Sequence, residues 1–463
     1  MQEYEGIADY AISYGLKQGF DYVEAYLESG GSFSYSRKQG NPNSSYKSKY
    51  SGIRLRLIKK GSLYTYSTNI ISKERIKEAF KFSGFKGEKV GLSEEKAEKY
   101  SYKVKERIKV EDSYESAVKD VEELDKSLNG LAYRSISISL GKYENLFVNS
   151  EGSRVYGEIP YISSFILIIV KDANDSRQKL IQLGNTGGYE VFKWEEIREN
   201  VEEEINSLKK VLKEGISLSK SQINGIKNVV ASSEIIGIAV HESIGHPLEA
   251  DRVFGREAAQ AGTSYLMPSN LGLKIGSKEV NIFDDPTIKN SYGFFLYDEE
   301  GVKARKKQLV KKGIQNELLL NREYAKALGT KSNASSRSDF YSNEPIIRMS
   351  NTYLEKGKAD FEELISEAKN GIYIKSFTEW NIDDTRSFAR YQGNEAYIIK
   401  NGDIEKPVKN YKLEKSTFDF WSSVYLLGND FNLYAGTCGK GEPQQGVPVM
   451  HGGPSALLKF GGK

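Results

Sequence analysis

Cysteine and histidine are scarce in this chain: its 463 residues include one cysteine, Cys438, and three histidines. A single cysteine excludes a disulfide within the chain. This usage fits a reducing setting, so we expect a cytoplasmic protein whose thiol remains available for other chemistry. Because histidine is so rare here, its placement is informative: His241 and His246 lie close together in the motif H-E-x-x-x-H.

Long apolar runs are also missing. The apolar stretch "FILIIV" at residues 165–170 has the length of a strand rather than of a membrane span. The opening sequence "MQEYEGIADYAISYG" begins with acidic residues and has no apolar segment, so we expect no signal peptide. Together these features predict a protein that is not associated with a membrane.

An excess of charge of one sign is absent as well. The chain has 66 basic and 63 acidic residues, a net charge of +3, and the two signs are interleaved. This balance gives no electrostatic argument for binding nucleic acid and weighs against a regulator that binds DNA. The basic run "KARKKQLVKK" at 303–312 lacks interleaved aromatic residues, and we interpret it as a solvated face beside a hairpin.

What is present predicts an α+β protein of two domains. An apolar fraction of 38% suffices for packed cores, and the length suits two or three domains. The composition shifts to small and polar residues in "GISLSKSQINGIK" (215–227), and we place the domain boundary there. We expect a mixed α/β domain with long antiparallel strands over residues 1–222. Residues 223–463 are expected to form a mainly β domain that carries the metal-site helix.

Periodic patterns predict individual helices and hairpins. Apolar residues at helical spacing predict a helix over 194–214. Alternating residues on either side of Lys60-Gly61 predict one hairpin, and those around Asn401-Gly402 predict another. The polar stretch 31–52 is open to two interpretations, a mobile loop or two long polar strands.

The segment "SSEIIGIAVHESIGHPLEAD" resembles one helix, with a serine cap before its apolar residues. Residues spaced i and i+4 on a helix are offset by about 40°, so the familiar H-E-x-x-H motif directs both imidazoles to one metal. His241 and His246 are spaced i and i+5, and their offset on a regular helix is about 140°. They can share a metal only if the helix is deformed between them, for example by a π-type bulge. Gly245 loosens the last turn, and Pro247 lacks an N–H and crowds the carbonyl of Ser243.

A catalytic zinc site takes three protein ligands and keeps a fourth position for water. The candidates for the third ligand are Cys438, His451, Glu249 and Asp251. Acidic residues just beyond a helix are more often solvated or act as caps. The thiolate of Cys438 is the softest ligand available and has glycine neighbours, although a lone cysteine is more often a buried, inert residue. His451 is also a candidate for binding substrate or stabilising an oxyanion, so the pattern alone leaves these choices open.

Five stretches of the second half carry a resemblance to a known family. They are "HESIGHPLEAD" (241–251), "FDDPTIKNSYGFFLYDEEGVKAR" (283–305), "RMSNTYLEKG" (348–357), "GNEAYIIKNGDIEKPVKN" (393–410) and "TCGKGEPQQGVPVMHGGP" (437–454). In these stretches the chain resembles the TldD/PmbA family of metalloproteases, on the TldD side. The first half of the chain is far less diagnostic.

The resemblance implies a site and an activity. The metal ligands would be His241, His246 and Cys438, the metal would be Zn²⁺, and Glu242 would be the general base that activates a zinc-bound water. The substrates would be short or unfolded peptides. TldD-like chains commonly pair with a TldE/PmbA-like paralogue that lacks the histidine motif, so we expect such a heterodimer or a homodimer. The alternative is a non-catalytic or regulatory subunit of a TldD/TldE-type protease complex, which would be expected to lack the histidine pair.

Overall fold

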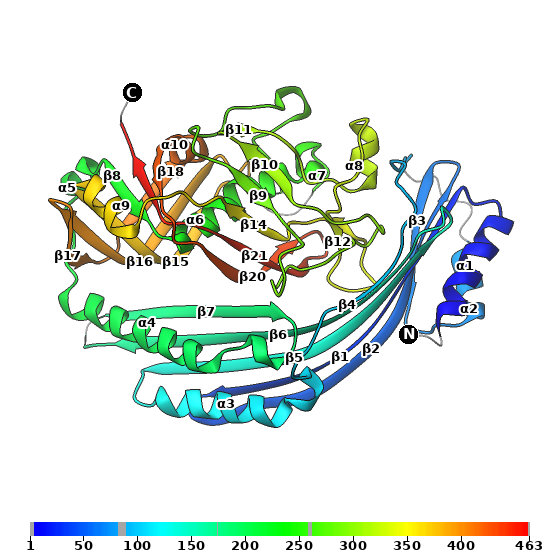
Figure 1. Cartoon of the computed structure of the whole chain (residues 1–463), viewed down its shortest axis with the longest axis horizontal. Helices are drawn as coiled ribbons and strands as arrows, with labels where there is room; N and C mark the ends of the chain where they lie inside the picture. The colour runs from blue at the N-terminus through cyan, green and yellow to red at the C-terminus, as the bar shows by residue number, and fades with distance from the viewer. Residues whose placement is uncertain (1–3, 82–88, 174, 258–261, 462–463) are drawn as a thin grey trace.

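The computed structural model describes residues 4–81, 89–173, 175–257 and 262–461. Figure 1 shows a broad, curved sheet from the first half of the chain, with a compact assembly of strands and helices from the second half on its concave side. This is the α+β architecture predicted from the sequence, with long antiparallel strands in the first half and mainly β structure in the second. No helix within the described ranges has both the length and the apolar character that a membrane crossing requires.

The first half forms a seven-stranded sheet flanked by helices. Its elements are α1 (Glu5–Lys17), β1 (Tyr22–Lys38), β2 (Asn41–Lys59), β3 (Ser62–Thr68), α2 (Lys73–Ala79), β4 (Lys99–Lys103), η2 (Val110–Asp112), α3 (Tyr114–Ser127), β5 (Tyr133–Asn149), β6 (Arg154–Lys171), β7 (Ser176–Thr186), η3 (Tyr189–Val191) and α4 (Trp194–Glu214). The strand order is β3-β2-β1-β5-β6-β4, and β7 also pairs with β6. Among the described strand pairs of this sheet, β4 and β6 are parallel to each other, and the other pairs are antiparallel.

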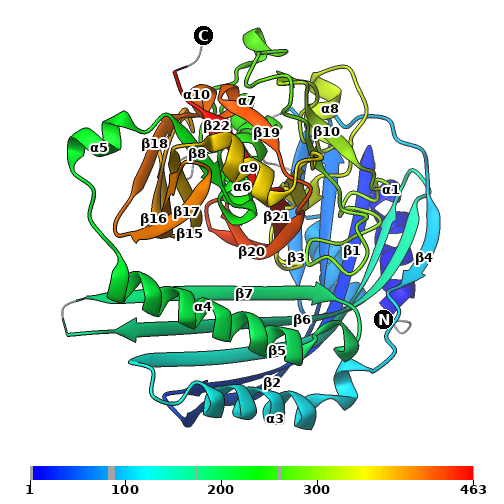
Figure 2. The same ribbon diagram turned by 60° about the vertical axis from the view of Figure 1, so that its left-hand side comes forward.

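The long strands settle the interpretation of the polar stretch 31–52. Most of it lies in β1 and β2, which pair along their whole length, so the two-strand interpretation is confirmed. The predicted helix over 194–214 is α4, which runs along β6 and β7 (Figure 2). Its buried side, including Val201 and Leu208, packs into one apolar core with residues of β5 and β6 such as Ile136 and Ile166. This packing follows from the apolar stripe on an amphipathic helix.

In the described part of the chain, the second half contains two further large sheets and one two-stranded sheet. Its elements are α5 (Lys220–Gly225), β8 (Asn228–Ala231), α6 (Ser233–Val240), η4 (His241–Gly245), η5 (His246–Leu248), α7 (Ala250–Val253), η6 (Pro268–Asn270), β9 (Ile282–Asp284), β10 (Lys307–Lys311), β11 (Ile314–Gln315), α8 (Arg322–Ala327), β12 (Ser336–Arg337), β13 (Ile346–Ile347), β14 (Asn351–Leu354), α9 (Phe361–Ala368), β15 (Gly371–Ile382), β16 (Phe388–Lys400), β17 (Asp403–Val408), β18 (Lys412–Ser416), α10 (Thr417–Ser422), β19 (Val424–Leu427), β20 (Asn432–Lys440), β21 (Gln445–Gly453) and β22 (Ala456–Lys459). One large sheet has the order β11-β10-β9-β14-β21-β20, and the other large sheet has the order β17-β16-β15-β8-β22-β19 with β18 beside β16.

Both predicted hairpins are present. β2 and β3 turn at Lys60 and Gly61, and β16 and β17 turn at Asn401 and Gly402. The basic run at 303–312 is itself part of a hairpin, because it contains β10, which pairs with β11. The interpretation of the run as a solvated face fails at Lys307, which is fully buried with its Nζ 2.9 Å from Oδ2 of Asp284. A buried carboxylate compensates the charge, which a count of basic residues does not reveal.

Helix α6 is enclosed between the two large sheets of the second half. It contacts β14, β20 and β21 of one sheet and β8 and β15 of the other. Six of its eight residues are apolar or glycine and are buried, as expected for a helix surrounded by protein on all sides. The histidine motif begins where this helix ends, so the candidate metal centre is built into the core.

Candidate metal centre

The regular part of the motif helix is α6, which ends one residue before His241. The hydroxyl of Ser232 caps its first turn by accepting a hydrogen bond from the backbone N–H of Ile235 at 3.3 Å. Burial on all sides fixes the direction of the helix, and therefore the position from which His241 projects.

The chain is π-helical from His241 to Gly245 and then forms a 3₁₀ turn from His246 to Leu248. The deformation predicted from the i, i+5 spacing is therefore confirmed. Pro247 offers no N–H to the preceding turn, and the hydroxyl of Tyr265 donates to the carbonyl of Ser243 at 2.9 Å instead. A side chain from outside the helix thus satisfies the carbonyl that the proline leaves without a partner.

Gly245 allows the π-helical turn to lie against the neighbouring chain. A Cβ at this position would lie 1.9 Å from Sδ of Met349, far inside van der Waals contact. A glycine is therefore needed here so that the turn can pack closely against Met349. It is not needed for its backbone conformation, which is helical and has no left-handed φ.

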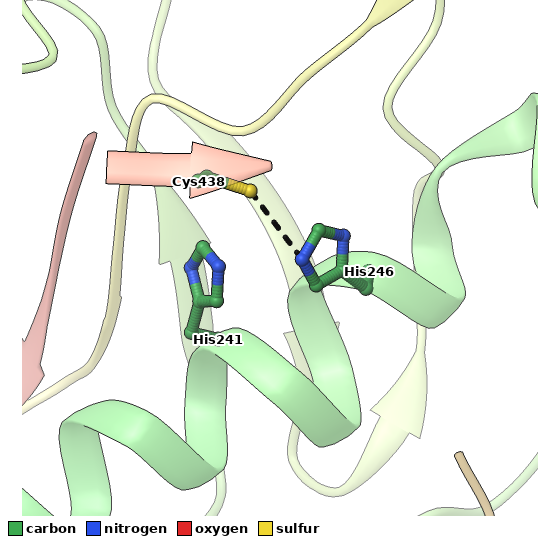
Figure 3. A group of neighbouring side chains, drawn as sticks. All are labelled: His241, His246 and Cys438. Carbon is green, nitrogen blue, oxygen red and sulfur yellow. Dashed lines mark hydrogen bonds between the residues drawn. The ribbon is translucent and has the colours of Figure 1, made fainter. Parts of the chain in front are cut away.

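The π-helical turn brings His241 and His246 to the same side, where they meet Cys438 from β20 (Figure 3). One potential ligand atom from each residue lies within 4.8 Å of the other two, and all three side chains are buried. Sγ of Cys438 lies 3.4 Å from Nε2 of His246, and the two imidazole centroids are 4.7 Å apart. Cys438, one of several candidates for the third ligand, is the one that the tertiary structure brings to the pair.

The donor set suits zinc. Two imidazoles and one thiolate form a three-ligand set of the kind found in catalytic zinc sites. Burial raises the pKa of the Cys438 thiol, but the positive charges of protonated His246 and His241 and of Arg348 outweigh burial and hold that pKa well below its usual value. The thiolate is the form that binds metal, so the residues present fit this ion.

Behind the imidazoles lies a buried charge cluster formed by Glu249, Arg252, Asp251 and Lys440. Oε2 of Glu249 lies 2.9 Å from Nδ1 of His246 and accepts a hydrogen bond from Nε of Arg252 at 2.7 Å. Nζ of Lys440 donates to both carboxylate oxygens of Asp251 at 2.7 Å. A carboxylate on the far nitrogen of a ligating histidine orients the ring.

This cluster corrects one interpretation of the sequence. Glu249 and Asp251 are buried rather than solvated, and they are not part of the cluster of ligand atoms. Lys440 is only 2% exposed and bound to Asp251, Glu249 and the carbonyl of Ile347. Its charge is therefore committed to the protein interior.

Glu242 lies next to His241 and is buried. Its Oε2 accepts a hydrogen bond from Nη1 of Arg386 at 2.5 Å. Burial raises the pKa of the Glu242 carboxyl, but the positive charges of protonated His246 and His241 and of Arg386 outweigh burial and lower the pKa to about 2. The carboxylate is therefore ionised and able to accept a proton.

His451, on β21, borders the site. Its ring centroid lies 5.6 Å from that of His241 and 6.3 Å from that of Tyr434, on which it stacks. Burial and the neighbouring His241 lower the pKa of His451 to about 3, so its imidazole is neutral. A neutral imidazole can donate one hydrogen bond, and His451 makes none to a described residue.

Sequence reasoning missed Arg386 and Arg348. Both are buried at the site, and Nη2 of Arg348 donates to the carbonyl of Cys438. Nothing local distinguishes them among 66 basic residues. Arg386 lies 144 residues from Glu242 in the sequence, and only folding brings them together.

Comparison with known proteins places the site in a family. Three sequence profiles match in order: PmbA/TldA metallopeptidase domain 1 at residues 23–84, the central domain at 95–212 and the C-terminal domain at 224–460. A metalloprotease of Methanothermobacter thermautotrophicus is 32% identical over 72% of this chain and 70% of its own length. A metalloprotease of Methanocaldococcus jannaschii is 29% identical over 94% of this chain and 95% of its own length.

A third relative, from Saccharolobus solfataricus, is named a zinc metalloprotease TldD homolog and is 27% identical over 74% of this chain and 75% of its own length. The crystal structure of TldE from Thermococcus kodakarensis has the same fold, with a TM-score of 0.79 over 98% of this chain and 99% of that one, at 16% identity. With three profiles matched in family order across most of its length, the chain belongs to the TldD/PmbA family of metallopeptidases.

Proposed function

We propose that the chain is a zinc-dependent peptidase that hydrolyses short or unfolded peptides. The observation that carries the proposal is the convergence of two imidazoles and one thiolate beside an ionised glutamate, produced by a π-helical turn. His241, His246 and Cys438 would hold the ion. Zinc in such a site supplies a Lewis acid and lowers the pKa of a coordinated water toward neutrality.

Glu242 is proposed as the general base. Its carboxylate accepts a proton from the attacking water and later delivers that proton to the leaving amine. His451 is proposed as a donor to the substrate carbonyl, because its neutral imidazole borders the site and has no hydrogen bond to a described residue.

Substrate selection is proposed to rest on main-chain recognition. β20, which carries Cys438, is the last strand of its sheet and has a ladder partner on one side only among the described strands. Main-chain groups on such an edge can pair with an extended peptide. Recognition of this kind would admit unfolded chains of many sequences and exclude folded ones.

Glu242→Gln tests the role of the base. We expect kcat on an unstructured peptide to fall by about 10²- to 10⁴-fold, because proton transfer is lost, while KM and zinc content stay unchanged. Glu202→Gln, on the exposed face of α4, is the matched control and should behave like the original chain. Cleavage by Glu242→Gln at the normal rate would remove Glu242 from the mechanism. A zinc-loaded original chain that cleaves no peptide would favour the alternative, a regulatory subunit.

A partner is also proposed. The resemblance implies a heterodimer with a TldE/PmbA-like paralogue, or a homodimer, and the TldE of Thermococcus kodakarensis shares this fold. Light scattering of the purified chain, alone and mixed with a histidine-less paralogue, separates these two assemblies.

A further inference from the structure

Arg386 occupies an unusual position in the fold. It lies in the turn between β15 and β16, where the preceding residues Asp383, Asp384 and Thr385 are all exposed. Arg386 itself is only 5% exposed, because its side chain turns inward to the end of α6. One inward cation in an exposed turn indicates that the turn serves the site beneath it.

Two hydrogen bonds join Arg386 to Glu242. Nη1 donates to Oε2 of the Glu242 side chain at 2.5 Å and to the Glu242 main-chain carbonyl at 3.2 Å. The Glu242 side chain is only 11% exposed, so the guanidinium also compensates a charge that water reaches poorly. Within the described ranges, the carboxylate has no other hydrogen-bond partner. One oxygen is thus held, and the other remains available.

The backbone is held in a strained conformation to make this contact. Arg386 has a φ of +61°, in the left-handed region that residues with a Cβ seldom adopt. Its carbonyl accepts a hydrogen bond from the hydroxyl of Thr417 at 2.6 Å, and its N–H donates to the carbonyl of Asp383 at 3.0 Å. Strain that the surrounding structure maintains often marks a position with a functional constraint.

We propose that Arg386 is a positioning residue for Glu242: it binds one carboxylate oxygen and so presents the other to the proton of the attacking water. The proposal rests on the peptidase function proposed above. A glutamate side chain has several rotatable bonds and a broadly distributed terminal torsion. Tethering Oε2 and the carbonyl of the same residue removes that freedom, and proton transfer is sensitive to misplacement of this kind.

The experiment compares Arg386→Ala and Arg386→Lys with Arg390→Ala. Arg390 is the matched control because it is an arginine of the same hairpin, but its Nη1 faces Glu414, 3.7 Å away. Each zinc-loaded variant is assayed for kcat and KM on an unstructured peptide, and its zinc content is measured. We expect Arg386→Ala to lower kcat by about 10- to 100-fold with KM and zinc content unchanged. Arg386→Lys, which keeps a charge, should fall between Arg386→Ala and the original chain, and Arg390→Ala should match the original.

A binding measurement supplies a readout that does not depend on turnover. A peptide hydroxamate chelates zinc and donates a hydrogen bond to a base carboxylate beside the metal. Calorimetric titration should show weaker hydroxamate binding for Arg386→Ala and for Glu242→Gln, and unchanged binding for Arg390→Ala.

Two results would overturn the inference. The first is a kcat for Arg386→Ala within about twofold of the original value, which would show that Glu242 needs no tether. The second is loss of zinc together with activity, which would show that Arg386 only supports the fold. If the original zinc-loaded chain neither cleaves peptide nor binds the hydroxamate, the proposed peptidase function itself is wrong.

Discussion

At the residue scale, the chemistry of the site depends on neighbours that hold each group in one state. Glu249 holds the ring of His246, the imidazoles and Arg348 favour the thiolate of Cys438, and Arg386 holds Glu242. Most of these partners are themselves buried ions. A buried charge destabilises the fold unless it is paired. Each buried ion at the site therefore needs its oppositely charged partner to stay buried.

Replacing Cys438 with serine tests the third ligand. A hydroxyl is a poorer ligand than a thiolate for zinc. We expect Cys438→Ser to weaken zinc affinity by at least about tenfold, measured by titration against a competing chelator. Thr437→Ala, the preceding residue on β20, is the control and should retain zinc. Equal zinc affinity in the serine variant would assign the third position to another side chain.

Asp284 and Lys307 form a buried ion pair, and this pair predicts a pH effect. Burial raises the pKa of Asp284, but Lys307 and hydrogen bonds from Ser350 outweigh it and leave the pKa below its usual value of 3.8. Because the folded pKa lies below the unfolded one, ionised Asp284 stabilises the fold above pH 3.8. That contribution is lost as pH falls below this value through the folded pKa.

Asp284→Asn removes the charge and leaves Lys307 buried without its carboxylate. We expect the free energy of unfolding at neutral pH to fall by about 3–5 kcal/mol, and its decrease with acid to become less steep. Urea unfolding at several pH values measures both effects. The adjacent Asp285→Asn should cost less, because its carboxylate is only part-buried. An unchanged free energy of unfolding in Asp284→Asn would contradict this account.

At the scale of the element, the decisive feature is the π-helical turn after α6. It converts a spacing that separates two imidazoles on a regular helix into one that brings them together. Pro247 removes one helical donor, Tyr265 supplies a substitute, and Gly245 lets the turn lie against Met349. The turn is therefore stabilised from outside as well as from within.

Gly245→Ala tests this element. Its Cβ would overlap Sδ of Met349, so we expect the free energy of unfolding to fall by about 1–3 kcal/mol and zinc affinity to weaken. Thermal unfolding and chelator titration measure the two effects. Gly225→Ala is a matched control, because a Cβ there meets no atom within 4 Å. Combining Gly245→Ala with Met349→Ala should restore part of the stability. A single variant as stable as the original would show that the close approach is unimportant.

At the scale of the whole molecule, buried ions join the curved sheet to the assembly that carries the site. Arg56, on β2, contacts Glu24 of β1 at 3.1 Å and reaches Glu300 and Glu344 of the second half at 2.9 and 2.8 Å. The division into residues 1–222 and 223–463 stays a prediction. The ion cluster indicates that these two parts would unfold together.

Arg56→Ala tests that coupling. It would leave the Glu24 and Glu300 carboxylates buried without their cation, so we expect the free energy of unfolding to fall by about 3–5 kcal/mol. Differential scanning calorimetry should also show the single transition broadening or separating. Arg75→Ala removes an exposed ion pair with Glu78, which water screens, and should leave the free energy of unfolding close to that of the original chain. If the Arg56→Ala variant unfolds like the Arg75→Ala control, the ion cluster does not contribute to the stability of the fold.

Local patterns in the sequence predict several of the helices and hairpins, and they predict that the helix at the site must be deformed. Periodicity predicted α4 and both hairpins, and the i, i+5 spacing of His241 and His246 required a deformed helix. These features depend on neighbours within a few residues, so a single sequence carries them.

Which distant groups meet at the site depends on the packing of the folded chain. It brought Sγ of Cys438 close to both imidazoles, placed Arg386 on Glu242 and turned Lys440 inward to Asp251. Each of these pairs joins residues more than a hundred positions apart. Their contacts depend on how two sheets enclose α6. Neither the hydrophobic periodicity nor a motif in the sequence predicts that packing.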